Sequence, residues 1–332
     1  MLHGLSRQLL AWRAPAGAQA RLSILIFHRV LPAPDPLFPG EVDAARFERI
    51  CAWVARWFNV LPLDAAVQRL RRGDLPARAL AITFDDGYED NHSQALPILQ
   101  RHGLPATFFI ATGFLDGGRM WNDTVIEAVR RTRQTVLDLD GLPGGDFGAH
   151  TLSDAASRRS AIGKLLPALK YLDPARRQAA VDALAARAQV SLPGDLMMSS
   201  QQVRGLHRAG MQIGAHTVTH PILARVDDIT AHGEITQSKA ALERLLGDEV
   251  RLFAYPNGKP GADYGPSAVD LARRAGFTAA VSTRPGSADA DSDAFQLPRF
   301  TPWRQTRLGF GAELYRNLKR PAALPLTRAQ PT

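Results

Sequence analysis

Two adjacent carboxylates and a pair of histidines are the residues of this sequence whose types and spacing could do chemistry. Asp85 and Asp86 follow a short apolar run, 79–84, that is rich in β-branched and aromatic residues, as a buried strand is. Gly87 then allows a sharp turn. Acids at the end of a buried strand are costly unless they are paired or bind a cation, although a turn followed by a helix cap would also explain them.

The histidines, His216 and His220, follow a second apolar run, 211–215. Imidazoles four residues apart lie on one face of a helical turn, close enough to share one ion. Pro221 disfavours a longer helix, so we expect a strand end followed by a single turn. Each histidine alone could be structural, but with the Asp pair they form a two-histidine, one-carboxylate set that leaves a position open for water. Such a set is typical of a catalytic metal site rather than a closed structural one.

At these two stretches the chain resembles the polysaccharide deacetylases, the NodB-homology proteins of carbohydrate esterase family 4. The Thr-Phe-Asp-Asp-Gly motif of that family is present at 83–87 and its His-Ser/Thr-x-x-His motif at 216–220, in the family's order. We expect the resemblance to extend over residues 22 to about 310. It implies an α/β fold, a distorted (β/α) barrel with fewer strands than the regular eight-stranded barrel. It also implies hydrolysis of N-acetyl groups on a carbohydrate.

The pattern along the chain agrees with that fold, because strand-like apolar runs alternate with helical ones. Strands are predicted at 22–28, 79–84, 105–111, 211–215, 251–255 and 277–281, and helices at 44–58, 63–72, 90–102, 121–131, 200–209, 227–246 and 266–275. Residues 113–200 interrupt the rhythm and predict a helical insertion, which either contacts substrate or only elaborates the fold. We therefore expect an N-terminal segment, 1–21, a deacetylase-like domain, 22–320, and a flexible tail, 321–332.

The net charge of +8 comes from many arginines and could attract nucleic acid or anionic lipid. The basic residues are scattered among acidic ones, without interleaved aromatic residues or a recognition motif, so we expect a solvated surface and no nucleic-acid partner. The single cysteine, Cys51, excludes an internal disulfide and fits a reducing compartment. Its apolar-periodic surroundings favour a buried structural thiol.

Residues 1–21 have a weak amphipathic pattern but not the continuous apolar stretch of a signal peptide. No run of about 18 or more apolar residues predicts a span across a membrane. We expect a docked or frayed terminal helix, with a helix on a membrane surface as the alternative. These features favour a cytoplasmic location, with association at the inner face of the membrane and a lipid-linked glycan substrate as variants of it.

The third family motif, normally a Phe followed by Arg-x-Pro-Tyr, is broken here. Residues 253–258, Phe-Ala-Tyr-Pro-Asn-Gly, align by their Phe, Pro and Gly, which puts Ala254 at the arginine position and Asn257 at the tyrosine position. The resemblance implies that the backbone N–H of Asn257 stabilises an oxyanion. In the family the arginine pairs with the base carboxylate. Arg299 is our candidate substitute, with an ordinary surface arginine as the alternative.

The last family motif, Leu-x-His, supplies the general acid and is absent, because His232 is the final histidine of the chain. A subgroup that acts on poly-N-acetylglucosamine similarly carries its acid histidine on the first strand. His28 ends the first predicted strand. We therefore predict that His28 is the general acid.

The resemblance then implies a complete site. Asp86, His216 and His220 are expected to hold a divalent cation, with zinc as the first candidate, and Asp85 to act as general base on the water that attacks an N-acetyl carbonyl. Protonated His28 is expected to give a proton to the departing amine, which leaves glucosamine and acetate.

Two other functions are compatible with the sequence. The broken motifs would suit a non-catalytic carbohydrate-binding domain, although the intact Asp85 favours an enzyme, because metal binding requires only Asp86. A metal-dependent amidase that acts on a non-sugar amide would use the same site. The predicted function is removal of N-acetyl groups from N-acetylglucosamine-type residues of a poly- or oligosaccharide.

Overall fold

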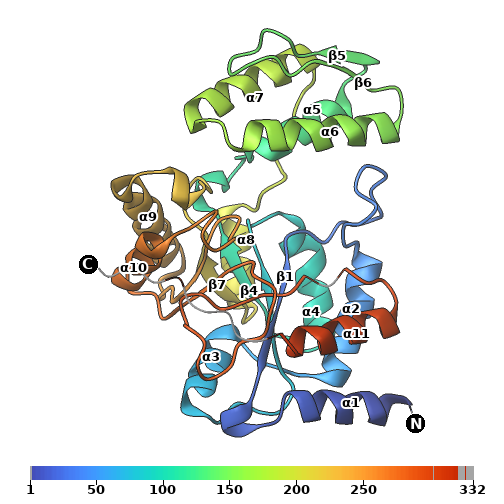
Figure 1. Ribbon diagram of the computed structural model, residues 1–332. Helices are drawn as coiled ribbons and strands as arrows, with labels where there is room; N and C mark the ends of the chain where they lie inside the picture. Colours follow the sequence, from blue (N-terminus) through green and yellow to red (C-terminus); the bar gives the residue numbers. More distant parts are fainter. Residues whose placement is uncertain (1, 302, 321–325, 327–332) are drawn as a thin grey trace. The chain divides into compact units, whose positions relative to one another are not determined.

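The computed structural model describes residues 2–301, 303–320 and 326, with side chains from residue 7 onward. The chain divides into two compact units (Figure 1). Unit 1 is formed from residues 1–32, 42–115 and 198–332, and unit 2 from residues 33–41 and 116–197. Most of unit 2 lies within the predicted insertion at 113–200, but the short segment 33–41 joins it from the region assigned to the barrel.

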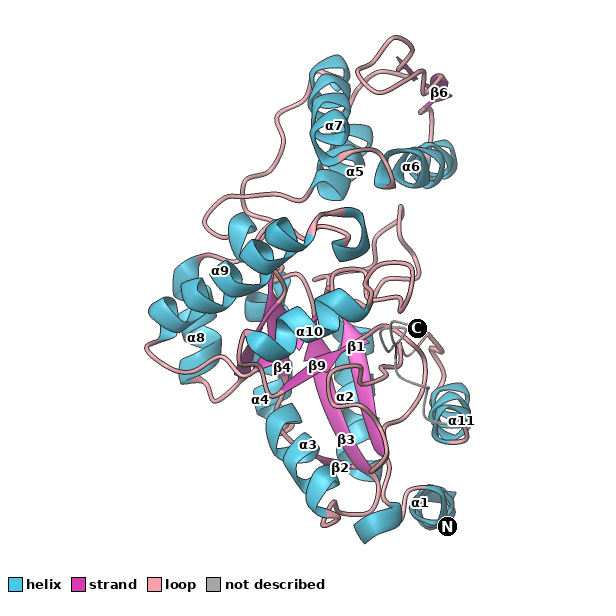
Figure 2. Ribbon diagram, turned by 60° about the vertical axis from the view of Figure 1, so that its left-hand side comes forward, coloured by secondary structure: helices cyan, strands magenta, loops and turns pink. Residues whose placement is uncertain are grey.

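A parallel sheet forms the centre of unit 1 and is magenta in Figure 2. Its strands are β1 (Leu22–Phe27), β2 (Asn59–Val60), β3 (Ala79–Phe84), β4 (Thr107–Ile110), β7 (Gln212–Ala215), β8 (Leu252–Ala254) and β9 (Ala279–Val281). They follow the order β1, β3, β4, β7, β8, β9, and the short β2 also pairs with β3. Every residue of β1 and β3 is buried, which explains why both strands are continuous, mostly apolar runs in the sequence.

The segment 297–300 joins the two edges of this sheet. Leu297 pairs with Val281 in β9, and Phe300 pairs with Leu25 in β1, both in parallel. Backbone hydrogen bonds of 2.8 to 3.1 Å accompany the two pairings. The sheet therefore curls into a distorted (β/α) barrel, and the fold prediction is confirmed.

Helices pack around the sheet of unit 1 (Figure 2). They are α2 (Ala44–Trp57), α3 (Leu63–Arg72), α4 (Leu96–Arg101), α8 (Ser200–Arg208), α9 (Asp228–Leu246) and α10 (Pro266–Arg274), with a π-helical turn, η2 (Asn91–Ala95), and 3-10 turns η1 (Gly17–Gln19), η3 (Thr112–Phe114) and η4 (Leu223–Arg225). Asp43, Ser199 and Asp227 cap α2, α8 and α9 by accepting a backbone N–H of the first turn. Their position one residue before each helix made these boundaries predictable.

Two helices near the chain ends, α1 (Leu2–Arg13) and α11 (Arg307–Leu318), lie side by side in both views (Figures 1 and 2). Arg13 Nε donates a hydrogen bond of 3.1 Å to the Tyr315 hydroxyl, and Leu10 is buried. The N-terminal helix is therefore docked, whereas α11 was not predicted. No helix of the described residues is long and apolar enough to cross a membrane. Apart from residue 326, the predicted tail at 321–332 lies outside the described residues.

Aromatic rings fix the end of β3. Phe84, its last residue, stacks on Phe108 with ring centroids 4.8 Å apart and on Phe27 at 5.4 Å, and Phe47 of α2 meets it edge-on at 5.6 Å. All four rings are buried. Such pairs add about 0.5–1.5 kcal/mol each beyond the burial of apolar area. The backbone therefore reaches Asp85 from a rigid part of the core.

Unit 2 is helical and has its own apolar core. Its elements are α5 (Trp121–Arg131), α6 (Ala155–Lys170), α7 (Pro174–Ala188) and an antiparallel hairpin of β5 (Val136–Asp138) and β6 (Ala149–Thr151). Asp35 attaches the segment 33–41, because Arg130 donates to its two carboxylate oxygens at 3.0 and 2.6 Å. Arg130 and Arg131 each donate to one oxygen of Glu127 at 2.8 Å. The helices were predicted, and the hairpin was not.

Candidate metal centre and active site

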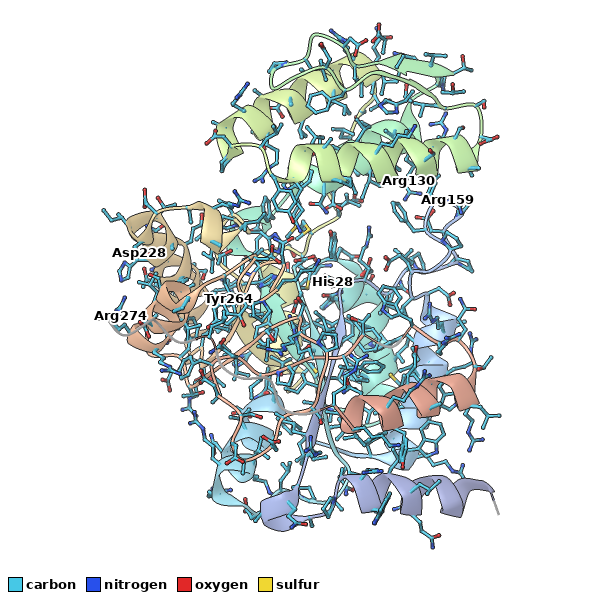
Figure 3. The ribbon with its side chains drawn as sticks, viewed as in Figure 1. His28, Arg130, Arg159, Asp228, Tyr264 and Arg274 are labelled. Carbon is cyan, nitrogen blue, oxygen red and sulfur yellow. The ribbon has the colours of Figure 1, made fainter. Side chains whose placement is uncertain are left out.

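The predicted site residues follow the carboxyl ends of four strands of unit 1. His28 follows β1, Asp85 and Asp86 follow β3, His216 follows β7, and the turn 255–258 follows β8. Because these strands are parallel, their carboxyl ends meet at one edge of the barrel, where such folds place their ligands. Figure 3 labels His28 at the end of β1. The fold thus brings together residues that are far apart in the sequence.

Asp86, His216 and His220 converge on one point. Asp86 Oδ1 lies 3.4 Å from Nε2 of His216 and 3.4 Å from Nε2 of His220. One ligand atom from each of the three residues lies within 4.8 Å of the others. His216 and Asp86 are buried, and the side chain of His220 is 17% exposed. The group is therefore almost enclosed but open beside His220.

This group fits a divalent cation. Asp86 Oδ1 is buried and has no hydrogen-bond partner among the described residues, because contacts of 3.4 Å are longer than an N–H···O bond. Native proteins rarely leave a buried oxygen without a partner. A tetrahedral cation with ligand bonds of about 2.0–2.1 Å would hold its ligand atoms about 3.4 Å apart, which agrees with the two separations found here.

The backbone orients the first histidine of this group. His216 Nδ1 lies 2.8 Å from the carbonyl oxygen of Ala254, the last residue of β8. A carbonyl oxygen can only accept a hydrogen bond, so Nδ1 must carry the proton. In the neutral imidazole, Nε2 then has its lone pair free for a metal, the arrangement usual for metal-binding histidines. Ala254 thus supports the site through its backbone, although it lacks the side chain of the family's arginine.

Burial and nearby charges act differently on the two histidines. Burial is the main cause that lowers the pKa of His220 to about 4, so this imidazole is neutral and available as a ligand at neutral pH. Burial acts in the same direction on His216, but Asp85 and Asp86 outweigh it and raise its pKa. Burial alone would raise the pKa of Asp86, but the imidazoles of His216, His220 and His28 lower it well below the usual range. A cation here competes with a proton on His216, so we expect its binding to weaken as pH falls.

Asp85 forms a buried ion pair with Arg299. Nη1 and Nη2 of Arg299 donate to Oδ1 and Oδ2 of Asp85, each at 2.6 Å, in a bidentate arrangement. Arg299 Nε donates to the Ser282 carbonyl at 2.8 Å, and Nη1 also donates to Thr83 Oγ1 at 3.2 Å. Burial alone would raise the pKa of Asp85, but Arg299 and then His216 outweigh it and lower the pKa. Asp85 is therefore ionised at neutral pH.

Arg299 reaches Asp85 from the segment 297–300 that closes the barrel. Its side chain is fully buried, which rules out an ordinary surface arginine. Position 254, where the family motif has its arginine, is a buried alanine. The contact between Arg299 and Asp85 agrees with the proposed substitution of one arginine for the other. The catalytic role of the pair stays a prediction.

His28 lies at the exposed side of the group. Its side chain is solvent-exposed, and its charge contributes to the lowered pKa of both Asp85 and Asp86, so it lies within electrostatic reach of the two carboxylates. Asn91 Nδ2 donates to the His28 carbonyl at 2.8 Å and holds the backbone after β1. This position allows contact with a substrate, and the role of general acid stays a prediction.

Asn257 lies in the turn after β8 with a positive φ of 60°. Its N–H donates no hydrogen bond to any described residue, while its carbonyl accepts one from Thr283 Oγ1 at 2.8 Å. Gly258 follows with φ of 71°, and a Cβ there would lie 2.9 Å from the Thr283 nitrogen, so this turn requires glycine. The turn thus presents an unpaired N–H, as an oxyanion-binding donor must be.

The site concentrates backbone strain. Seven described non-glycine residues have a positive φ, and four of them are Asp86 (74°), Thr217 (64°), His220 (55°) and Asn257 (60°). This conformation is unfavourable for most residues and most of all for a β-branched one such as Thr217. Each instance costs of order 1–3 kcal/mol and persists only where the surroundings enforce it. Most of the described non-glycine residues with a positive φ are therefore candidate ligands, the candidate oxyanion donor or their direct neighbours.

Several residues that support the site were not predicted. Thr83 could have been found, because it lies two residues before Asp85 and so points to the same side of the strand. Ala254 and Ser282 act through backbone carbonyls, for which a sequence gives no signal. Glu234 of α9 bonds the loop between the two histidines, and nothing in its spacing from the motif indicates this.

Comparisons with known proteins identify the family of this chain. The family model for polysaccharide deacetylase matches residues 72–158 and 164–280. The Bacillus subtilis (strain 168) protein YxkH is 20% identical over 282 residues, which are 84% of this chain and 71% of that protein. Poly-beta-1,6-N-acetyl-D-glucosamine N-deacetylase of Staphylococcus aureus is 34% identical over 74 residues, which are 22% of this chain and 26% of that enzyme.

Two solved structures share the fold. The Streptococcus pyogenes deacetylase PplD, in complex with acetate, has a TM-score of 0.60 and 18% identity over 91% of this chain and 100% of its own. IcaB from Ammonifex degensii has a TM-score of 0.57 and 19% identity over 92% of this chain and 99% of its own. Because the family model matches more than half of the sequence, this chain belongs to the polysaccharide deacetylase family, whose members are hydrolases of non-peptide carbon–nitrogen bonds.

Proposed function

We propose that this protein removes N-acetyl groups from N-acetylglucosamine-type residues of a poly- or oligosaccharide and that it depends on a divalent cation, with zinc as the first candidate. The observation that carries the proposal is the convergence of Asp86, His216 and His220 on one point next to the buried pair of Asp85 and Arg299. Family membership supports deacetylation of a polysaccharide in general. The cation is inferred from this site, and the sugar from the family and from one relative.

The substrate class draws support from one relative. The Staphylococcus aureus enzyme is named for poly-β-1,6-N-acetyl-D-glucosamine, but its similarity to this chain covers only 74 residues. The likeness is enough to choose a β-1,6-linked N-acetylglucosamine oligomer as the first substrate to test. It does not extend to the length of the glycan or to a lipid anchor.

Asp86, His216 and His220 would hold the cation. The chemistry that such a cation supplies when bound is activation of water and polarisation of a carbonyl oxygen. Asp85 accepts a proton from the water as the water oxygen attacks the acetamide carbon. Arg299 keeps Asp85 ionised and fixes its orientation through two hydrogen bonds. Because the carboxylate is ionised and keeps one orientation, it can accept the proton of the attacking water.

Two further groups complete the proposed reaction. The Asn257 N–H donates to the acetamide oxygen as negative charge develops on it. His28 gives its proton to the amide nitrogen, so the carbon–nitrogen bond breaks with the electron pair on an amine rather than on an amide anion. The new carbon–oxygen bond comes from water. The products are acetate and a free amino sugar.

The buried ion pair of Asp85 and Arg299 supports an enzyme over a non-catalytic carbohydrate-binding domain. A domain that only bound sugar would need neither Asp85 nor a buried arginine to neutralise it. An ion pair of this kind is expensive to bury, and its removal is often neutral or stabilising when apolar residues replace both partners. Retention of both charges beside the metal ligands therefore favours catalysis.

The proposal is tested by measuring acetate release from a β-1,6-linked N-acetylglucosamine pentamer. We expect release by the zinc-loaded protein, loss of release after treatment with a chelator, and recovery when zinc is added back. Small N-acetylated amides without a sugar serve as the comparison. Release from these amides alone would favour the amidase alternative, and sugar binding without any release would favour the non-catalytic one.

A further inference from the structure

Glu234, on the second turn of α9, holds the loop between the two histidines by three hydrogen bonds. Its Oε2 accepts the backbone N–H groups of Val218 and Thr219 at 2.7 and 2.8 Å. Its Oε1 accepts the Thr219 hydroxyl at 2.6 Å. Both oxygens of one carboxylate are thus used on two consecutive residues of the His-Thr-Val-Thr-His stretch.

The loop that Glu234 holds is strained on both sides of these contacts. Thr217 has φ of 64° and His220 has φ of 55°. Within the loop, Thr217 Oγ1 accepts the His220 N–H at 3.1 Å and donates to the His216 carbonyl at 2.5 Å. A strained backbone of this kind needs external contacts to hold it. Glu234 contributes three side-chain hydrogen bonds of 2.6 to 2.8 Å to residues 218 and 219.

A second contact holds the opposite side of the loop. The N–H groups of Thr112 and Gly113 donate to the carbonyls of Thr217 and Val218 at 3.1 and 2.8 Å. A Cβ at position 113 would lie 2.7 Å from the Val218 oxygen, so this close approach requires glycine. The peptide groups between the histidines are therefore fixed from both sides, by the backbone after β4 and by the carboxylate of Glu234.

The helix that carries Glu234 is anchored in the core. Its neighbour Ile235 and the residues Ala231 and Leu242 are buried. The helix begins at the Asp227 cap, and it packs on β7, the strand that ends at His216. A carboxylate on such a helix is a fixed reference point for the loop. The first histidine is positioned by the strand and the second depends on the loop.

We propose that Glu234 is a positioning residue for the metal centre, which sets the place of His220 by holding residues 218 and 219. This inference rests on the proposed metal site. Glu234 does not act as a ligand, because the ligand group of the described residues contains Asp86, His216 and His220 only. Outer residues that orient metal ligands typically change metal affinity by about 10–100-fold when they are removed.

The test is the zinc affinity of the metal-free protein, measured by competition with a chromophoric chelator, together with its melting temperature. We expect Glu234→Ala to bind zinc about 10–100-fold more weakly than the wild type. Glu234→Gln keeps one oxygen for the two N–H groups, so it should lose less than about 10-fold. Because glutamine has nearly the same shape as glutamate, Glu234→Gln can still be measured if the alanine variant does not fold.

The matched control is Glu243→Ala on the same helix. Glu243 accepts hydrogen bonds from Lys239 and from the Val250 N–H, away from the site. Its loss should lower the melting temperature and leave zinc affinity unchanged. Wild-type zinc affinity in Glu234→Ala, or an equal loss in Glu243→Ala, would overturn the positioning role while the metal site stands. A wild-type protein that binds no zinc would overturn the metal site and this role together.

Discussion

Two groups of charged side chains, one in each unit, form their hydrogen bonds in different ways. In unit 2, both oxygens of Asp35 and both oxygens of Glu127 accept hydrogen bonds from Arg130 or Arg131. In unit 1, Arg299 satisfies both oxygens of Asp85 in the same way, but Asp86 Oδ1 has no hydrogen-bond partner and faces two imidazole nitrogens. In the unit 2 group every carboxylate oxygen named here accepts a hydrogen bond, whereas in the unit 1 group Asp86 Oδ1 accepts none from the described residues.

The difference shows how a structural ion-pair network can be told from a site. Each group connects distant parts of the chain, and each contains a bidentate arginine–aspartate pair. A link between distant segments and a bidentate pair therefore do not by themselves distinguish a site from a structural network. The distinguishing feature is one buried acceptor without a donor, placed among nitrogen atoms that can bind a cation. Variants in each of the two groups test this distinction.

The largest effect is expected from Asp85→Asn. Asparagine has nearly the same shape but cannot accept the proton of the attacking water, so turnover should fall by at least about 10³-fold. Bound zinc should be unchanged, because Asp86 and the two histidines remain. Acetate release and metal content measured on the same sample check both statements. Near-normal turnover would remove Asp85 from the role of base.

His28→Ala should lower turnover by about 10² or more, because the departing amine would lose its proton donor. His28 is exposed, so melting temperature and zinc affinity should stay close to those of the wild type. The matched control is His232→Ala. His232 is also exposed but lies on α9, and this variant should retain full activity. Equal rates for the two variants would point to another acid.

Arg299→Met leaves Asp85 buried without a partner and should cost about 3–5 kcal/mol of the free energy of unfolding. Because the pair lowers the pKa of Asp85, its contribution is present above the unfolded pKa of about 3.9 and is lost as pH falls through the folded pKa. The stability difference from the wild type should therefore be largest at neutral pH and shrink in acid. Denaturant unfolding at several pH values measures it. The double variant with Asp85→Asn should regain part of the loss, and a further loss would contradict the pairing.

The smallest effect on the site is expected from Arg130→Met in unit 2. Asp35 and Glu127 would lose donors, but Arg130 is partly exposed and water can replace some contacts, so we expect about 1–2 kcal/mol of destabilisation. Zinc affinity should not change, since this group contains no open acceptor. Thermal unfolding and zinc titration compare the two properties. A weaker zinc affinity would show that the two groups are coupled.

Most of the barrel could be predicted from the sequence. The runs 22–28, 79–84 and 211–215 are short and mostly apolar, as buried parallel strands are, and this pattern predicted the three strands. The helix α11 was missed because Gly309 and Gly311 lower its helix propensity, although buried residues recur at helical spacing in it. The hairpin of unit 2 has strands of three residues, which pair only in the folded unit.

The candidate site, like the barrel, could be predicted from the sequence only in part. Side chains could be predicted where a motif or a strand end placed them, and Arg299 could be proposed because the arginine that is missing from the family motif needed a substitute. The positive φ of Thr217 and His220, the Ala254 carbonyl and the contacts of Glu234 could not. They arise from the way that separate segments meet, and a single sequence does not contain that information in its spacing.

The closure of the barrel by the segment 297–300 has a consequence for the order in which the protein matures. Asp85 and its neighbours are synthesised more than two hundred residues before Arg299. Until that segment joins the two sheet edges, Asp85 lacks the cation that keeps it ionised in the core. A nascent or truncated chain that ends before Arg299 therefore contains both sequence motifs, but its Asp85 has no arginine partner, and under the proposed mechanism it has no ionised general base.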